Sequence, residues 1–337
     1  MAIARVGLCF ALLISTCESD AGMRPVHHYV FFGQDREALR GHLAFTRTKA
    51  FEGAQVVYSW RQLEPEKDKY DFSLIREDLA FMRSKGKRLF VQLQDVTFSA
   101  SRINVPEYLQ HEREYNGGVA RQYHLDGDSE DGARVEGWMA RRWDLAVQRR
   151  WHKLLLALGA EFDGRIEGIN LAETACEVGR SGRLFPAGFS FEIYRDAIIT
   201  NMTALRRAFR SSVPMQYANF MPGEWLPDDD KGYLRAVYAA AQELGVGVGG
   251  PDLLPFRRGQ RNHSYPLIRA AASAVATGVA VQEGNYDDTD PETGRRMTAS
   301  ELLAFATAYL RVRYIFWGTE EPHYSREVIP LVERVRD

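Results

Sequence analysis

Residues 54–60 (AQVVYSW), 73–85 (SLIREDLAFMRSK) and 88–93 (RLFVQL) decide the fold class of this sequence. The first and third segments are short apolar runs, as expected of buried strands. The middle segment places Ile75, Leu79 and Met82 on one face at helical spacing. A strand, a helix and a second strand in succession predict two parallel strands joined by a helical crossover.

The same rhythm continues along the chain in both directions. The expected strands are residues 29–33, 54–60, 88–93, 166–171, 213–220, 246–249, 279–283 and 314–317. Helical stretches separate them, and one helix is expected to open with a capping box formed by Thr298 and Glu301. Eight such units close a barrel. The sequence therefore predicts an α/β protein, a single-domain (β/α)8 TIM barrel with a long loop after the third strand at residues 96–140.

An open doubly wound sheet is the alternative topology, and it usually carries a glycine-rich phosphate turn after an early strand. The only candidate turn, residues 245–250, comes late in the chain and runs into Pro251 rather than into a helix. We therefore expect neither a nucleotide site nor any other cofactor.

Composition narrows the class of partner. The formal net charge is −2, whereas nucleic-acid binders usually carry a strong basic excess, so no nucleic-acid partner is expected. His27 and His28 precede the first expected strand, and His111, His124 and His263 lie in loops, so no catalytic metal is predicted. The acidic run at residues 126–131 lacks the full ligand pattern of a calcium loop and is expected to be solvated surface.

Residues 1–22 have the pattern of a secretory signal peptide. Arg5 precedes a short apolar run at residues 6–14, and Ser19-Asp20-Ala21 offers a small-x-small cleavage signal. We expect an exported protein with a mature domain at 23–337. Lipid attachment at Cys17 and a buried first strand or helix are the alternatives. After Met23 no stretch is long and apolar enough to span a membrane, and Cys176 remains as a lone cysteine, expected to be buried.

In a barrel of this kind the active site forms where the strands end at their carboxyl side. The residues expected there include carboxylates, amides and aromatic rings. They are Trp60, Gln94, Asn170, Glu173, Tyr217, Asn219, Asp252, Glu283 and Trp317. Two carboxylates on opposed strands suit glycoside hydrolysis, in which one acid protonates the leaving oxygen and the other attacks the anomeric carbon or activates water.

Several motifs make the chain resemble the clan of retaining (β/α)8 glycosidases. The clearest is YSWRQLEP at 58–65 followed by YDFS at 70–73, with IEGINLAE at 166–173, Gln282-Glu283 and Phe316-Trp317 as further matches. The resemblance covers most of residues 29–337. In this clan the acid/base stands on strand four and the nucleophile on strand seven.

Carried over residue by residue, the resemblance implies Glu173 as acid/base, Glu283 as nucleophile and Trp317 as the platform beneath the sugar. Asn170 would bind the sugar 2-hydroxyl, although it stands three residues ahead of Glu173 rather than directly before it. Glu167 is the alternative acid. Tyr217 is the candidate to hold the nucleophile in its charged form.

The function implied is an exported glycosidase that cleaves β-glycosidic bonds of an oligo- or polysaccharide with retention. A non-catalytic glycan-binding barrel is the second reading, and a barrel lyase or transglycosylase is the third.

Overall fold

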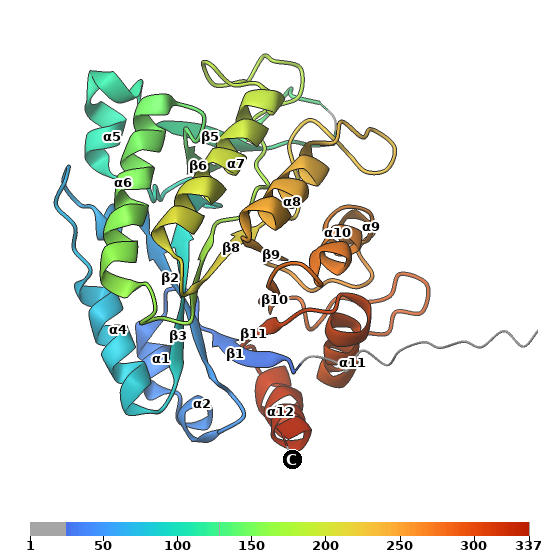
Figure 1. The fold of residues 1–337 in the computed structure, drawn as a ribbon. Helices are drawn as coiled ribbons and strands as arrows, with labels where there is room; N and C mark the ends of the chain where they lie inside the picture. Colours follow the sequence, from blue (N-terminus) through green and yellow to red (C-terminus); the bar gives the residue numbers. More distant parts are fainter. Residues whose placement is uncertain (1–24, 128, 337) are drawn as a thin grey trace, which may run out of the picture.

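Eight parallel strands close into a barrel in the computed structural model, which describes residues 25–127 and 129–336 (Figure 1). The barrel strands, in order around it, are β1 (His27–Phe31), β2 (Gly53–Ser59), β3 (Arg88–Gln94), β7 (Gly168–Leu171), β8 (Val213–Tyr217), β9 (Gly247–Gly250), β10 (Thr277–Val281) and β11 (Tyr314–Gly318). Pairing of β11 with β1 completes the closure. The predicted (β/α)8 barrel is confirmed, whereas the expected signal peptide and Cys17 lie outside the described residues.

Helices surround the barrel and cover its outer face (Figure 1). They are α1 (Arg36–Gly41), α2 (Leu43–Arg47), α3 (Trp60–Leu63), α4 (Ser73–Ser84), α5 (Glu107–His111), η1 (Arg113–Tyr115), α6 (Leu145–Phe162), α7 (Phe191–Ala208), α8 (Tyr233–Leu244), α9 (Arg258–Asn262), α10 (Ser264–Ala271), α11 (Ala299–Ala304), η2 (Phe305–Tyr309), η3 (Tyr324–Val328) and α12 (Ile329–Arg336). The predicted capping box is present, since Thr298 and Glu301 exchange side-chain to backbone hydrogen bonds at the start of α11.

The apolar side chains form two layers separated by the barrel wall. The inner layer fills the barrel with Tyr29, Phe90, Met215, Tyr217, Ala280, Tyr314 and Phe316. The outer layer lies between strands and helices and contains the alternate strand residues, such as Val30, Ile315 and Trp317. Because neighbouring residues of a strand point to opposite faces, β1, β3, β10 and β11 each supply both layers.

The glycine run that does not form a nucleotide turn is strand β9. A Cβ on Gly249 would lie 2.2 Å from the Gly278 carbonyl oxygen and 3.2 Å from the Tyr217 ring. A Cβ on Gly278 would approach Met215 and Phe316, each at 3.2 Å. These two strands therefore carry glycine because large side chains from neighbouring strands fill the barrel.

The segment after β3, expected to be a long loop, has structure of its own. Strands β4 (Val96–Thr97), β6 (Arg134–Ala140) and β5 (Val119–His124) pair in that order as an antiparallel sheet. The acidic run expected to be solvated surface is only partly so. Asp126 and Asp131 are exposed, but the Glu130 carboxylate is 6% exposed and accepts hydrogen bonds from the backbone N–H groups of Arg180 and Ser181.

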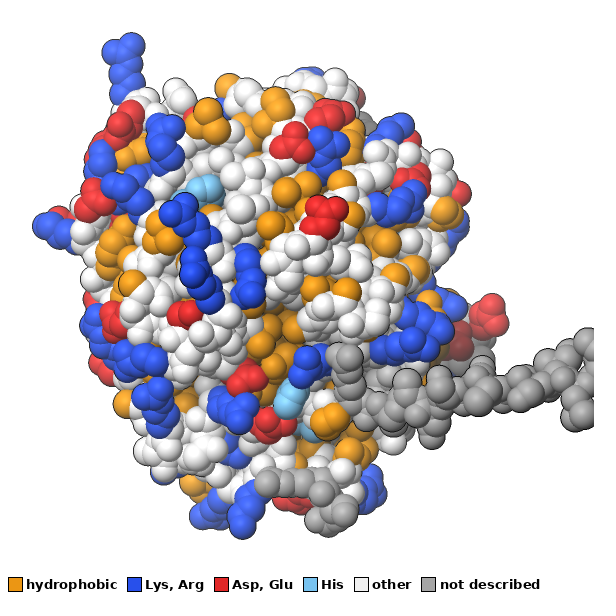
Figure 2. Space-filling view, in the orientation of Figure 1, with side chains coloured by type: hydrophobic (Ala, Val, Ile, Leu, Met, Phe, Trp, Pro, Cys, Tyr) orange, Lys and Arg blue, Asp and Glu red, His pale blue; other side chains and the backbone are white. Residues whose placement is uncertain are grey.

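Charged side chains of both signs are interspersed over the face shown in Figure 2. Among the helices within residues 25–127 and 129–336, none has the length and hydrophobicity needed to cross a membrane.

Candidate active site

Glu173 lies two residues beyond β7, in a segment held by backbone hydrogen bonds from several sides. Arg142 donates to the Glu173 carbonyl oxygen at 3.0 Å, and the Tyr194 hydroxyl donates to the Thr174 carbonyl oxygen at 3.0 Å. The Thr174 N–H donates to the Tyr217 carbonyl oxygen at 3.1 Å, and its hydroxyl donates to the Phe220 carbonyl oxygen at 2.6 Å. This irregular segment is therefore fixed to strand β8 and to α7.

A buried ion pair supports the same segment. The Arg142 guanidinium donates two hydrogen bonds to the Asp95 carboxylate, at 2.7 and 2.6 Å, and a third to the Tyr194 hydroxyl at 2.7 Å. Both charged side chains are 5% exposed. Such a bidentate pair fixes the orientation of the guanidinium, which in turn holds the backbone of Glu173. We did not predict the role of Arg142, since no pattern in the sequence links it to strand four.

The Glu173 side chain combines burial with a single amide donor. The pKa of its carboxyl is raised to about 7, chiefly by burial and also by the nearby Asp252 carboxylate, while the Asn219 hydrogen bond and the Arg142 charge oppose the rise. Nδ2 of Asn219 donates to Oε2 of Glu173 at 2.6 Å. Oδ1 of Asn219 accepts from the backbone N–H groups of Ala175 and Phe220, which fixes the orientation of the amide.

Asp252 follows strand β9 and is the second carboxylate whose environment is unusual. Burial raises its pKa, and the hydrogen bond from Nδ2 of Asn285, at 3.1 Å, opposes that rise. Oδ1 of the same Asn285 accepts from the backbone N–H groups of Leu253 and Gln282. Asn285 therefore joins the end of β9 to the turn that follows β10.

That turn carries Glu283. Strand β10 ends at Val281 rather than at residue 283 as predicted, so Glu283 lies two residues beyond the strand. Its side chain is exposed, and the described part of the chain gives it no hydrogen-bond or ion-pair partner. The turn itself is anchored, because Gln282 donates to the Pro251 carbonyl oxygen at 2.9 Å and the Gly284 N–H donates to Glu320 at 2.8 Å.

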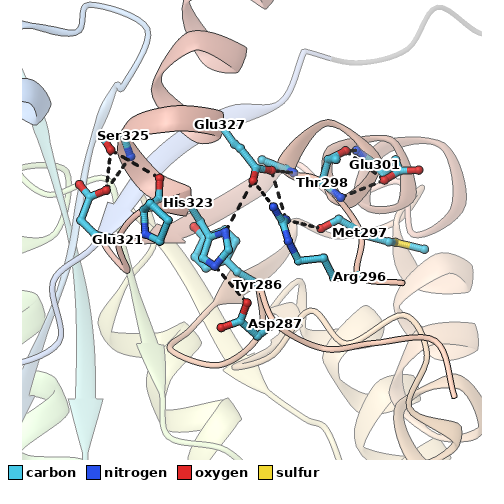
Figure 3. Close-up of polar contacts among 12 residues, drawn as sticks. Tyr286, Asp287, Arg296, Met297, Thr298, Glu301, Glu321, His323, Ser325 and Glu327 are labelled. Carbon is cyan, nitrogen blue, oxygen red and sulfur yellow. Dashed lines mark hydrogen bonds and ion pairs between the residues drawn. The ribbon is translucent and has the colours of Figure 1, made fainter. Parts of the chain in front are cut away.

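The loop that continues from Glu283 is fastened to η3, as Figure 3 shows. The ring of Tyr286 stacks on His323 with centroids 5.3 Å apart, and His323 contacts Asp287 at 3.1 Å. Arg296 at the far end of the loop pairs with Glu327 at 2.5 Å. These contacts fix the loop, and the Glu283 side chain is exposed near the end of β10.

A polar network lies inside the barrel below these carboxylates. Nε2 of Gln55 donates to Oδ1 of Asn170 at 2.9 Å and to the Tyr217 hydroxyl at 2.8 Å. All three side chains are fully buried. Tyr217 and Asn170 therefore bond to Gln55, and neither is in hydrogen-bond contact with a carboxylate of the described chain. Gln94, at the end of β3, has a buried Oε1 without a hydrogen-bond partner among the described residues.

The two tryptophans expected to bind sugar belong to the core. Trp317 and Trp60 have no exposed surface. Trp317 points outward from β11, and its Nε1 contacts Nδ1 of His28 at 3.1 Å, whereas Nε1 of Trp60 donates to Glu64 at 2.9 Å. A ring without exposed surface cannot stack on a ligand. Trp317 is therefore not the sugar platform that the sequence predicts.

Glu167, the alternative acid, lies at the opposite end of the barrel. It precedes β7, where it accepts from Arg88 at 2.9 Å and from the Tyr314 hydroxyl at 2.7 Å. Its distance along the strand from Glu173 places it at the amino-terminal side, away from the rim where active sites of such barrels form.

A metal centre and a catalytic thiol have less support than a pair of carboxylates. The described residues contain no group of three or more His, Cys, Asp or Glu side chains arranged to hold a metal ion. Burial raises the pKa of the Cys176 thiol to about 12, so it is not present as a thiolate at neutral pH.

Comparison with known proteins gives the fold but no family. No protein-family model matches the sequence, and no curated protein matches it. Among solved structures, the chain is similar to the catalytic domain of β-amylase from Paenibacillus polymyxa, with a TM-score of 0.58, 8% identity and coverage of 91% of this chain and 98% of that one.

Two further similar structures are GH5_18 proteins, each solved in complex with Manβ1-4GlcNAc. The one from Streptomyces cattleya has a TM-score of 0.57, 14% identity and coverage of 93% of this chain and 81% of that one. The one from Bifidobacterium longum subsp. longum has a TM-score of 0.54, 10% identity and coverage of 91% and 72%. The resemblance to (β/α)8 glycosidases is thus confirmed as a likeness of fold.

Proposed function

We propose that this protein is an exported glycoside hydrolase that cleaves β-glycosidic bonds of an oligo- or polysaccharide with retention. The observation that carries the proposal is the environment of Glu173. A carboxyl with a pKa of about 7 keeps its proton near neutral pH and can protonate a leaving oxygen. The similar solved structures, a β-amylase catalytic domain and GH5_18 proteins with a bound Manβ1-4GlcNAc, support a carbohydrate substrate.

Glu283 is the proposed nucleophile. It is exposed to water, which solvates a carboxylate, whereas Glu173 is only partly exposed. The contrasting environments suit the two carboxyl groups to different roles, Glu173 as the proton donor and Glu283 as the nucleophile. Their strands, β7 and β10, lie three neighbours apart around the barrel, so the two acids approach a bound sugar from different sides of the rim.

The proposed reaction has two steps. Glu173 donates its proton to the glycosidic oxygen while a Glu283 oxygen attacks the anomeric carbon, so that the carbon–oxygen bond to the leaving sugar breaks and a glycosyl ester forms. Water then attacks the anomeric carbon, Glu173 removes its proton, and the Glu283 carboxylate leaves. Asn219 stabilises the charged form of Glu173 between the two steps through its hydrogen bond.

Asp252 is proposed to bind substrate hydroxyl groups and to tune Glu173. Its charge opposes ionisation of Glu173, and Asn285 links it to the turn that bears Glu283. The buried Oε1 of Gln94 is a further acceptor for a sugar hydroxyl.

A second candidate function is a non-catalytic glycan-binding barrel, because the Glu283 side chain has no partner that fixes its position among the described residues. Hydrolysis of a panel of aryl β-glycosides and common polysaccharides distinguishes the two. An enzyme loses turnover at least about 100-fold in Glu173→Gln and in Glu283→Gln while retaining its fold. A panel that the wild-type protein leaves unhydrolysed, but to which it binds, supports the non-catalytic function.

A further inference from the structure

A cavity of about 920 Å³ opens beside Glu173 at the end of the barrel where β7 and β8 finish. Its wall includes Ala175 and Cys176, which lie two and three residues after Glu173, and Phe220, which follows the hydrogen-bond partner of Glu173, Asn219. The loops after β7 and β8 project together at the upper end of the view in Figure 1. The cavity therefore adjoins the segments that carry Glu173 and Asn219.

Two aromatic side chains on the cavity wall are unusually exposed. Trp225 is 51% exposed and Phe98 is 57% exposed, although both rings are large and apolar. They come from different barrel units, since Phe98 follows β4 and Trp225 lies between β8 and α8. Exposed aromatic rings on a concave surface are a feature of ligand sites rather than of packing.

The Trp225 ring is held in a fixed orientation. It stacks on Phe220 with centroids 5.9 Å apart and an interplanar angle of 6°, and it meets the buried ring of His263 edge-on at 4.6 Å. Nε2 of His263 accepts from the Leu226 N–H at 2.8 Å, so Nδ1 carries the proton and donates to the Gly259 carbonyl oxygen at 2.8 Å. Because His263 is fixed at both nitrogens, a ligand that stacks on Trp225 does not have to order the ring first.

Another part of the cavity wall is bonded to the connection between strands β5 and β6. Glu130, from the β5–β6 connection, accepts from the N–H groups of Arg180 and Ser181 and from the Ser181 hydroxyl. Those hydrogen bonds lower the pKa of Glu130 to about 2, so the anchor is charged at any pH of interest. Gly179 and Arg180, which line the cavity, are thereby fixed to the insertion.

The charges on the cavity wall select against anionic ligands. The lining contains the carboxylates of Glu177, Glu224 and Asp229 and one guanidinium, that of Arg180. Glu224 is committed to α8, where it accepts from the Tyr233 and Leu234 N–H groups. Arg180 already pairs with Glu177 at 3.6 Å, and Asp229 pairs with Lys231 at 2.5 Å. An acidic sugar chain would therefore find no uncommitted cation among the described residues of this lining, whereas a neutral chain offers apolar ring faces to the aromatic side chains.

We propose that this cavity binds the sugar units of a neutral oligosaccharide next to the bond that is cleaved, with Trp225 as the stacking platform. The inference rests on the glycosidase function proposed above and names the substrate class and the residue that selects it.

The test measures binding by calorimetry in Glu173→Gln, which does not turn the ligand over. The probes are cellohexaose, xylohexaose, mannohexaose, maltohexaose and hexagalacturonic acid. We expect at least one neutral hexaose to bind and the acidic one not to bind. Trp225→Ala should then raise the Kd for that hexaose at least tenfold. Trp225→Phe, which keeps an aromatic ring, should bring the Kd most of the way back to that of Glu173→Gln alone. Tyr309→Ala removes a partly exposed ring on the outer helices and should leave the Kd unchanged.

Absence of binding by every neutral hexaose, or an unchanged Kd in Trp225→Ala, overturns the inference. Thermal unfolding of Trp225→Ala separates a lost platform from a lost fold. The proposed catalytic function fails on a different result, namely wild-type rates of glycoside hydrolysis in Glu173→Gln.

Discussion

Nδ2 of Asn219 lies 2.6 Å from Oε2 of Glu173, and the two backbone N–H groups bonded to Oδ1 of the same amide keep Nδ2 pointed at the carboxylate. A donor favours the charged form of a carboxyl and so lowers its pKa. Asn219 therefore limits how far burial raises the pKa of Glu173, which lies at about 7.

Replacing Asn219 by Ala should raise the pKa of Glu173, because it removes the hydrogen bond to the charged form. The falling limb of the kcat profile should move to higher pH by roughly half to one unit. Asn262→Ala, on α9, is the matched control and should leave the profile unmoved. A limb that stays in place, or moves to lower pH, contradicts the assignment of Glu173 as the acid.

Glu173→Gln should stabilise the protein at alkaline pH. The folded carboxyl has a pKa of about 7 against an ordinary value of 4.5, so the unfolded chain releases this proton first and stability falls between pH 4.5 and 7. Above pH 7 the charged Glu173 carboxylate lowers the free energy of unfolding by about 3 kcal/mol. The variant has no such charge and should recover a part of this loss. Urea unfolding at pH 5 and pH 8 measures it. A difference between variant and wild type that does not grow with pH counts against the buried acid.

Asp252→Asn and Glu283→Gln should have different consequences. Asp252 raises the pKa of Glu173, so its loss should move the falling limb of the rate profile to lower pH while measurable turnover remains. Glu283→Gln should lower turnover by at least about 100-fold because the nucleophile is gone. Full profiles of both variants provide the measurement. If Asp252→Asn abolishes turnover and Glu283→Gln spares it, Asp252 rather than Glu283 is the second catalytic carboxylate.

Arg142→Met should destabilise the fold by roughly 3–5 kcal/mol, because it leaves the buried Asp95 carboxylate without its partner. The double variant Arg142→Met/Asp95→Leu removes both charges and should recover much of that loss. Denaturant unfolding of the single and double variants checks this. Equal stability of Arg142→Met and wild type would show that the pair does not hold the segment at Glu173.

The barrel could be predicted because its signals are local and repeated. Each strand is a short apolar run and each helix has one apolar face, so eight units could be counted without knowing any long-range contact. The capping box at Thr298 and Glu301 was predictable for the same reason, since both residues lie within one turn. The sheet formed by β4, β5 and β6 was missed because its strands are partly exposed and lie among loop residues.

Other features of the site depend on relationships that no local pattern carries. Trp317 was expected at the mouth of the barrel, but its neighbour Phe316 belongs to the inner layer, so alternation turns Trp317 outward. Arg142, between β6 and α6, contacts Asp95 and the Glu173 backbone, which are 47 and 31 residues away in the sequence. Trp225 becomes a candidate only once its exposure and the adjoining cavity are known.

The most direct test of the central claim, that Glu173 is the general acid, compares leaving groups in Glu173→Ala. The substrates are a phenyl and a 2,4-dinitrophenyl glycoside of the sugar that the wild-type protein cleaves. A lost acid should lower kcat/KM by roughly 100-fold or more on the phenyl glycoside, whose leaving oxygen needs a proton, and far less on the dinitrophenyl glycoside, whose leaving oxygen does not. Equal losses on the two substrates, or no loss on either, contradict the account.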